Sequence, residues 1–280
     1  MTGTIYLVAT PIGNLDDLSP RAITVLKQAD RIACEDTRHS GKLLRHFEID
    51  KPLLSYHEHN ENKRAKELIR MACNGEKIAV ICDAGMPGIS DPGYRVVHAA
   101  IDAGVPIVPI PGPTAVATAL AASGLPTDRF RFEGFLPSKK SLRRKALEAL
   151  KYERSTTICY ETSRRICDTL ADIAELFGAR PVVVARELTK LHEEFLRGTA
   201  RSIISILEQR AVIKGEITLL IGGGEKAPFD PENVTSRVAT LLTNGVDRMD
   251  AIKQVAREFG VSKSEVYRLV EDLRSNANKV

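Results

Sequence analysis

Residues 77–93 read KIAVICDAGMPGISDPG, in which an apolar, β-branched run passes directly into a loop rich in glycine and proline. Two other stretches have the same order. The run 5–9 leads into TPIGNLDD at residues 10–17, and the run 107–110 leads into PGPTA at residues 111–115. Short β-branched runs that alternate with helical segments are typical of an open α/β sheet, where ligands bind beyond the carboxyl ends of the strands. We therefore expect the three loops to meet and form a binding site.

The rest of the chain continues this alternation. Strands are predicted over 5–9, 31–34, 53–56, 77–82, 107–110, 130–135, 156–160, 182–186 and 216–221. Helices are predicted to start at Ser19-Pro20 and at Asp91-Pro92, where a capping residue precedes proline, and at Asn60, from which a helix runs to about Asn74. The expected domains are an N-terminal α/β lobe (1–118), a C-terminal α/β lobe (119–225) and a helical tail (232–280) that follows a Gly- and Pro-rich linker.

The composition is that of a globular protein, with 280 residues, 43% of them hydrophobic and 27% charged, and a formal net charge of +4. Three common classes of enzyme lack their motifs. The chain has no GxxxxGK[ST] loop, no GxGxxG after the first strand and no GxSxG. This argues against a P-loop nucleotide hydrolase, a nicotinamide-dependent Rossmann enzyme and a serine hydrolase.

The sequence predicts a cytoplasmic protein without a membrane segment. Its five cysteines are scattered and form no CxxC pair, which is typical of reduced thiols, and the amino end lacks the basic region of a signal peptide. The uncharged stretch 103–127 is long enough to span a bilayer, but it contains five prolines, each of which removes a backbone donor from a helix.

Eight blocks, in order over residues 4 to about 221, resemble the branch of the tetrapyrrole methylase family that methylates ribosomal RNA. They are ATPIGNLDDLSPRA, CEDTR, YHEHNE, DAGMPGISDPG, PGPTA, EGFLP, YETSRR and RELTKLHEE. The resemblance implies a two-lobed α/β fold of class III S-adenosylmethionine methyltransferases, here with a small all-helical C-terminal extension, and a homodimer. It further implies 2'-O-methylation of a cytidine in the decoding region of 16S ribosomal RNA, with that RNA or the small ribosomal subunit as partner.

The resemblance also implies residues for the S-adenosylmethionine site. They are Pro11, Asp83, Gly85, Ile89, Ser90, Pro113, Thr114 and Ala115 from the first lobe and Tyr160, Glu161, Glu216 and Ile217 from the second. Asp83 is the leading candidate, because a carboxylate at a strand end can pair with the cationic part of the cofactor.

Candidates for accepting the proton of the ribose hydroxyl are Glu35, Asp36, His57 and Glu187. The first three belong to a polar cluster at predicted strand ends, together with Arg38, Glu58, His59 and Asn60. This cluster is interpreted as a set of hydrogen-bonding groups that face RNA. A metal site and a solvated loop are the alternatives, and no metal ligand is assigned because no spacing is diagnostic.

Positive charge is concentrated between residues 138 and 165, where nine basic residues stand against three acidic ones. Phosphate contacts are predicted from this segment and from two of the eight blocks, CEDTR and RELTKLHEE, at Arg38, Arg143, Arg144, Lys145, Arg165, Arg186 and Lys190. A solvated helix face and surface salt bridges are the alternative interpretations.

The tail has the spacing of a helix-turn-helix, with a predicted capping box from Ser262 to Glu265 and with Lys263, Ser264 and Arg268 facing outward. It is expected to bind nucleic acid or another protein. Two other functions stay open, a tetrapyrrole methylase and a DNA-binding regulator that uses this tail. The first usually opens with a GxGPG loop, which the chain lacks, and the second leaves about 220 residues of α/β sequence unexplained.

Overall fold

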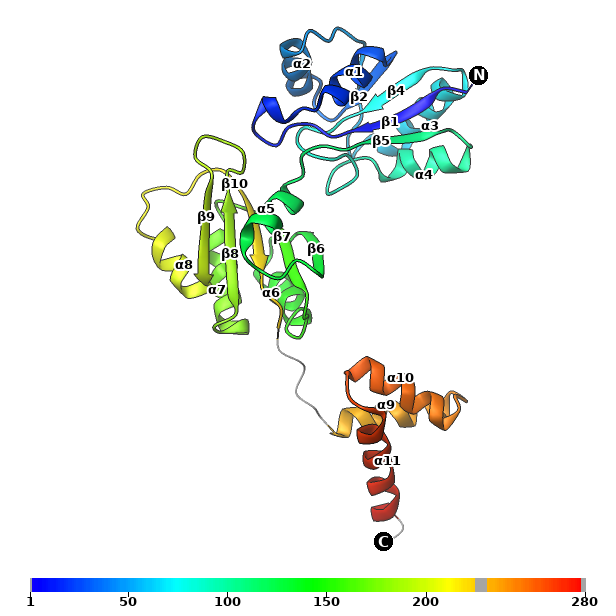
Figure 1. Cartoon of the computed structure of the whole chain (residues 1–280), viewed down its shortest axis with the longest axis vertical. Coiled ribbons are helices and arrows are strands. Elements are labelled where there is room, and N and C mark those ends of the chain that lie inside the picture. The colour runs from blue at the N-terminus through cyan, green and yellow to red at the C-terminus, as the bar shows by residue number, and fades with distance from the viewer. Residues whose placement is uncertain (1, 225–230, 278–280) are drawn as a thin grey trace. The chain divides into compact units, whose positions relative to one another are not determined.

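The computed structural model describes residues 2–224 and 231–277, which form two compact units (Figure 1). The larger unit comprises Met1–Lys151 and Ser155–Gly223, and the smaller comprises Tyr152–Arg154 and Gly224–Val280. The smaller unit contains the predicted helical tail. Residues 225–230 of the expected linker and residues 278–280 of the tail lie outside the described residues.

The first half of the larger unit is built on a five-stranded parallel sheet with strand order β3-β2-β4-β1-β5. The strands are β1 (Thr4–Val8), β2 (Arg31–Cys34), β3 (Leu53–Ser55), β4 (Lys77–Val80) and β5 (Ile107–Ile110). All five predicted strands are thus confirmed, with ends that shift by up to two residues. The strand order reverses between β4 and β1, which is the point where ligands bind in open α/β sheets.

Helices cover both faces of this sheet. They are α1 (Pro20–Gln28), α2 (Thr37–His46), α3 (Glu61–Cys73) and α4 (Tyr94–Asp102), with a short 3-10 helix η1 (Leu15–Asp17) after β1. Buried residues of α1 and α2 pack with Ala79 and Ile81, whereas those of α3 and α4 pack with Ile78 and Val80. Successive strand residues therefore point into two different cores, and this accounts for the nearly continuous apolar strands of the sequence.

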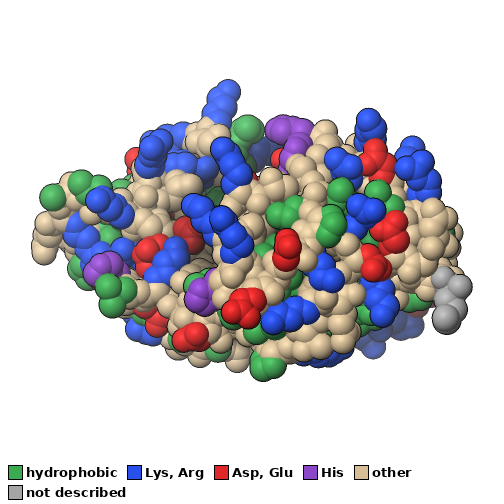
Figure 2. Space-filling view, turned by 90° about the horizontal axis from the view of Figure 1, so that it is seen from above, with side chains coloured by type: hydrophobic (Ala, Val, Ile, Leu, Met, Phe, Trp, Pro, Cys, Tyr) green, Lys and Arg blue, Asp and Glu red, His purple; other side chains and the backbone are tan. Residues whose placement is uncertain are grey.

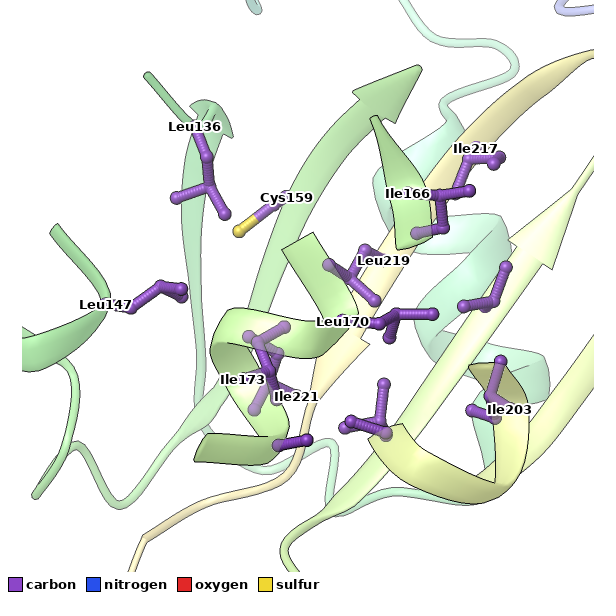
Figure 3. Close-up of a cluster of buried hydrophobic side chains, with 14 of the residues drawn as sticks. Leu136, Leu147, Cys159, Ile166, Leu170, Ile173, Ile203, Ile217, Leu219 and Ile221 are labelled. Atoms are coloured by element: carbon purple, nitrogen blue, oxygen red, sulfur yellow. The ribbon is translucent and has the colours of Figure 1, made fainter. Parts of the chain in front are cut away.

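The second half of the larger unit has a mixed sheet with strand order β6-β7-β10-β8-β9, in which only β6 and β7 pair in parallel. Its strands are β6 (Phe130–Phe135), β7 (Thr156–Thr162), β8 (Pro181–Arg186), β9 (Glu194–Thr199) and β10 (Glu216–Ile221). Strand β9 was not predicted. Helices α6 (Lys140–Ala149), α7 (Ile166–Phe177) and α8 (Ala200–Leu207) bury apolar side chains against one face (Figure 3).

The opposite face of the second sheet is covered by α5 (Ala115–Ser123). Val116, Ala119 and Leu120 of this helix form a buried cluster with side chains of β7, β8 and β10. The expected end of the first lobe, residue 118, therefore falls inside a helix that packs on the second sheet. The packing changes from one sheet to the other between Ile110 and Ala115.

The predicted helix starts had mixed outcomes. Ser19 caps α1, since its hydroxyl accepts the Ala22 N–H at 3.1 Å. Helix α3 starts after Asn60 as predicted, but the Asn60 side chain does not cap it. This side chain accepts the His57 N–H and donates to the Ser55 carbonyl, both earlier in the chain. The start at Asp91-Pro92 is wrong, because α4 begins only at Tyr94.

The reason for this late start lies on another helix. The Glu61 carboxylate, at the start of α3, accepts the backbone N–H groups of Gly93 (3.2 Å) and Arg95 (3.3 Å) and the Tyr56 hydroxyl (3.1 Å). The N-terminal donors of α4 are thus satisfied from outside the helix, and Asp91 is left for another role.

The smaller unit contains α9 (Pro231–Thr243), α10 (Arg248–Phe259) and α11 (Lys263–Ala277), which share a core centred on Val255 and Val266. The capping box is confirmed, with Glu265 N–H bound to the Ser262 hydroxyl and the Glu265 carboxylate bound to Ser262 N–H. Lys263, Ser264 and Arg268 are exposed as expected. Within residues 2–224 and 231–277, no helix combines the length and hydropathy required to cross a membrane.

The basic helix α6 differs from the expected surface for phosphates. Arg143 is 3% exposed, and its Nε donates to the Asp172 carboxylate of α7 at 2.8 Å. Arg144 binds Asp172 at 3.1 Å and also pairs with Glu175. Lys145 is exposed and has no such partner among the described residues. The prediction that Arg143 contacts RNA is therefore wrong, because its guanidinium is buried in an ion pair.

This ion pair predicts a stability effect that surface charges do not share. Arg143→Ala leaves Asp172, which is 2% exposed, with part of its charge uncompensated, and should lower the free energy of unfolding by ~3 kcal/mol. Lys145→Ala, on the same helix, should change it by less than ~0.5 kcal/mol. Urea unfolding of both variants measures the difference. A double change, Arg143→Met with Asp172→Leu, should recover most of the loss, and equal unfolding midpoints for the two single variants would contradict the assignment.

Candidate functional site

The loops after β1 and β4 are joined by backbone hydrogen bonds. Thr10 N–H donates to the Gly85 carbonyl at 2.9 Å, and Gly85 N–H donates to the Thr10 carbonyl at 3.1 Å. The buried Thr10 hydroxyl also donates to the Cys82 carbonyl at 3.0 Å. Gly85 has φ +88°, in the left-handed region, and a Cβ there would lie 3.6 Å from Ile12 and 3.8 Å from the Pro113 carbonyl. The three expected loops thus meet at this glycine.

A cavity of about 400 Å³ opens between these loops and the second sheet of the same unit. On one side lie Ile12, residues 84–86 and 89–91, and the start of α5 at Thr114 and Ala115. On the other side lie Phe135, residues 160–163, Ala185, Leu188 and residues 215–218. The volume falls in the usual range for small-molecule sites.

Nine of the twelve residues predicted to hold the cofactor line this cavity. They are Gly85, Ile89, Ser90, Thr114, Ala115, Tyr160, Glu161, Glu216 and Ile217. Pro11, Asp83 and Pro113 do not line it, although each directly precedes a residue that does. Asp83, the leading candidate, instead accepts the Asp36 N–H with its Oδ1 at 3.4 Å.

Asp91 is the carboxylate of the first-sheet loops that lines the cavity. Burial and the nearby charges of Glu35 and Asp83 raise its pKa to about 6, while a hydrogen bond with Cys82 opposes the shift. Gly93, two residues later, lies so close to Gly88 that a Cβ would come within 2.6 Å of the Gly88 nitrogen. The loop therefore folds back on itself and turns Asp91 toward the cavity rather than toward α4.

The sequence interpretation missed other lining residues. Ile12 and Leu188 are buried apolar side chains of the same core cluster, whereas Phe135 is 56% exposed and packs against Tyr160 with ring centroids 5.5 Å apart. Each of these three residues lies inside one of the eight sequence blocks, so the sequence indicated the right segment but not the individual residue. Burial and the charge of Asp91 raise the pKa of Tyr160 to about 12, which agrees with their common place on the cavity wall.

The Glu161 carboxylate is occupied inside the protein. It accepts Thr162 N–H at 2.7 Å, the Thr169 hydroxyl at 2.7 Å and Arg165 at 3.2 Å. Arg165 also donates to the Leu136 carbonyl at 2.7 Å. The network ties the end of β6 to the end of β7. Arg165, predicted to contact RNA, therefore has its guanidinium engaged in supporting the cavity wall.

The four candidate proton acceptors differ in how free they are. Asp36 caps α2 by accepting Arg38 N–H at 2.8 Å, and this bond lowers its pKa. Glu187 accepts the Lys190 ammonium at 2.8 Å and Glu216 N–H at 3.0 Å, and the Lys190 contact lowers the pKa of Glu187. Both carboxylates are thus held as weak bases.

The other two candidates, His57 and Glu35, neither cap a helix nor pair with a Lys or Arg of the described chain. Asn60 Nδ2 lies 3.2 Å from His57 Nε2, so in a neutral ring Nε2 accepts and Nδ1 carries the proton. The half-buried Glu35 carboxylate has no hydrogen bond within the part of the chain that the structure describes. Burial and Asp83 raise its pKa, with His57 opposing the rise. Of the three carboxylates, Glu35 is therefore the most basic and the one with the fewest bonds.

The remaining cations predicted to bind RNA differ in whether their side chains are already bound to other residues. Arg186 is bound to Glu194 at 3.1 Å and to the Lys214 carbonyl at 3.0 Å, and Lys190 bridges Glu187 and Glu216. The side chain of Arg38 is 91% exposed, with Asp36 3.6 Å from its Nε. Among residues 2–224 and 231–277, no group of three His, Cys, Asp or Glu side chains is placed to hold a metal.

Comparisons with known proteins agree with this arrangement. A family model described as Tetrapyrrole (Corrin/Porphyrin) Methylases matches residues 4–204. A protein of Halalkalibacterium halodurans named Ribosomal RNA small subunit methyltransferase I is 50% identical over 275 residues, which cover 95% of this chain and 94% of that protein. A protein of the same name from Synechocystis is 45% identical over 278 residues, covering 98% and 99%.

A solved structure supports the fold. The uroporphyrin-III C-methyltransferase of Thermus thermophilus, in complex with S-adenosylhomocysteine, aligns with a TM-score of 0.52 at 18% identity, over 78% of this chain and 97% of that one. The chain therefore belongs to the tetrapyrrole methylase family and, within it, to the ribosomal RNA small subunit methyltransferase I proteins.

Proposed function

We propose that this protein transfers a methyl group from S-adenosylmethionine to the ribose 2'-hydroxyl of a cytidine in 16S ribosomal RNA. The observation that carries the proposal is the 45–50% identity, over nearly the whole chain, to proteins named for ribosomal RNA of the small subunit. The solved tetrapyrrole methylases are less than 25% identical and share only the fold. A DNA-binding regulator would leave the cavity of the larger unit without a role.

The cavity has the chemistry that S-adenosylmethionine requires. Apolar side chains such as Ile12, Leu188 and Ile217 offer surface for an adenosine, and the backbone of residues 84–86 and 114–115 offers hydrogen-bonding groups. Asp91 supplies a negative charge in a half-buried position. When bound, the cofactor supplies an activated methyl group beside a positive sulfur. The residues present therefore fit the group.

Asp91 takes the role that the sequence assigned to Asp83. The Asp91 carboxylate lines the cavity, whereas the Asp83 carboxylate accepts the backbone N–H of Asp36. Glu35 and Asp83 raise the electrostatic cost of ionising Asp91, and a cation in the cavity relieves this cost. The site therefore favours a positively charged ligand over a neutral one.

Glu35 removes the proton of the ribose hydroxyl in this proposal. It lies directly after β2, close enough to Asp91 that its charge contributes to the raised pKa of Asp91. His57 Nδ1, which carries the proton in the neutral ring, is buried and has no partner among the described residues. Alignment of the hydroxyl remains the larger task, because a general base contributes typically ~10² to 10⁴-fold.

The proposal includes a cytoplasmic location and a homodimer. All five cysteines are free thiols, which suits a reducing compartment. Large apolar side chains are left exposed on the larger unit, with Leu191 at 93%, Tyr94 at 70% and Ile101 at 66%. Sedimentation equilibrium should give a mass of about twice 30.7 kDa, and a single-chain mass at micromolar concentration would exclude the dimer.

The first test of the cofactor site compares two carboxylates of one loop. Asp91→Asn should weaken S-adenosylmethionine binding by ~1.5 to 3 kcal/mol in calorimetry, because a charge-assisted contact is lost, and Asp83→Asn should have the smaller effect. In the wild type, affinity should fall about tenfold between pH 7.5 and pH 5, as Asp91 with its pKa of about 6 becomes protonated.

S-adenosylhomocysteine is the matched control, since it lacks the sulfonium charge and should show a smaller dependence on both Asp91 and pH. Equal losses for the two ligands in Asp91→Asn would show that the carboxylate does not respond to the sulfonium.

The second test concerns the proton. Glu35→Gln should slow single-turnover methylation by at least ~10²-fold at saturating cofactor and RNA, with both affinities preserved. Glu187→Gln, which changes a carboxylate that is already bound to Lys190, should have a milder effect. If the single-turnover rate of Glu35→Gln stays within a few-fold of the wild type, the proton of the ribose hydroxyl is transferred to water. The catalysis then depends on how the enzyme positions the hydroxyl and the methyl group.

A further inference from the structure

A second hollow, of about 360 Å³, lies outside the cavity, between α2 and the segment that leads from it into β3. We call it the α2 groove. Its polar lining is strongly basic, with Arg38, Lys42, Arg45 and Lys51 set against a single carboxylate, Asp50. Figure 2 looks down on the face that carries α1 and α2 in Figure 1, and Lys and Arg side chains are numerous there.

The cations of the α2 groove make few contacts with the rest of the protein that the structure describes. Lys42 and Lys51 make no hydrogen bond or ion pair with any residue that the structure describes, and Arg38 is almost fully exposed. Arg45 donates only its Nε, to the Gly41 carbonyl at 3.1 Å, which leaves its terminal nitrogens free. This contrasts with Arg143, Arg144 and Arg165 of the basic segment, which are bonded to internal carboxylates. Free cations around a hollow are available to an anionic ligand.

Gly41 is a second indication that the α2 groove can hold a ligand. It stands in the interior of α2, where glycine is unfavourable. A Cβ at this position would meet only Leu53 Cδ1, at 3.9 Å, so the packing of the protein does not require glycine. Gly41 lines the groove, and the missing side chain keeps the groove open down to the helix backbone.

We propose that the α2 groove binds the phosphate backbone of the RNA substrate next to the target nucleotide. The inference rests on the proposed function. Arg38, Lys42 and Arg45 follow one another at helical spacing, so their attachment points span about 10 Å along one face of α2. The helix starts two residues after Glu35. A strand held along this face leads to the proposed proton acceptor, and several successive phosphates face the cations.

The experiment compares two double variants that remove the same charge. Lys42→Gln with Lys51→Gln removes two cations of the groove, and Lys27→Gln with Lys63→Gln removes two exposed cations of α1 and α3. The probe is a transcript of 16S ribosomal RNA. The groove variant should bind it about 25-fold more weakly at 0.1 M salt, and the slope of log affinity against log salt should be shallower by about 1.4. The control variant should keep the wild-type slope, and both should keep the affinity for S-adenosylhomocysteine.

Gly41→Gln tests the shape of the groove without changing its charge. It should weaken RNA binding while the cofactor affinity stays at the wild-type value and the melting temperature is the same or higher, because glycine is unfavourable inside a helix. If the wild type binds and methylates the RNA, and the groove variants match it in affinity and slope, the groove proposal fails and the proposed function stands. If the wild type does not bind ribosomal RNA although it binds S-adenosylhomocysteine, both proposals fail.

Discussion

The pair of hydrogen bonds between Thr10 and Gly85 is the constraint on which the site depends. They join the loops after β1 and β4, neighbouring strands at the point where the order of the sheet reverses. Gly85 must adopt a positive φ to make them, and its missing side chain lets Ile12 and Pro113 come close. Pro113 leads directly into α5, which packs on the second sheet. One junction between two loops thus also fixes how the chain enters the second half of the larger unit.

The electrostatics of the site follow from crowding of negative charge at the ends of β2 and β4. Burial raises the pKa of both Glu35 and Asp91, and the charge of Asp83 adds to the rise at both, as that of Glu35 does at Asp91. No Lys or Arg of the described residues forms an ion pair with them, and His57 only opposes part of the rise at Glu35. The same crowding serves two purposes, because it favours a cationic ligand in the cavity and makes Glu35 a better base.

Positive charge is distributed in the opposite way. Arginines close to the second sheet are bound to carboxylates and carbonyls, where they hold helices and loops in place. Arg143 fixes α6 to α7, Arg165 fixes the end of β6 to β7, and Arg186 is bound to Glu194 on the neighbouring strand. A count of basic residues therefore overestimates the surface that can attract RNA. The α2 groove has fewer cations than the basic segment, but the side chains of Lys42 and Lys51 have no partner among the described residues and that of Arg38 is 91% exposed.

The resemblance of eight sequence blocks to a known family indicated that the chain is a methylase. The sequence by itself also determined most of the strands and the loops at their ends, because strand periodicity and turn chemistry are local properties. It did not show β9, an edge strand that is partly exposed along its length and lacks a clear alternation. Twelve residues were expected at the cofactor site, and nine of them line one cavity in the structure. Only the tertiary structure decided which carboxylate faces that cavity and which arginine is buried. Asp91 is released from α4 by Glu61, thirty residues earlier in the chain, and Arg143 is buried because Asp172 lies opposite it on α7. Such choices depend on partners far away in the sequence, and no local pattern encodes them.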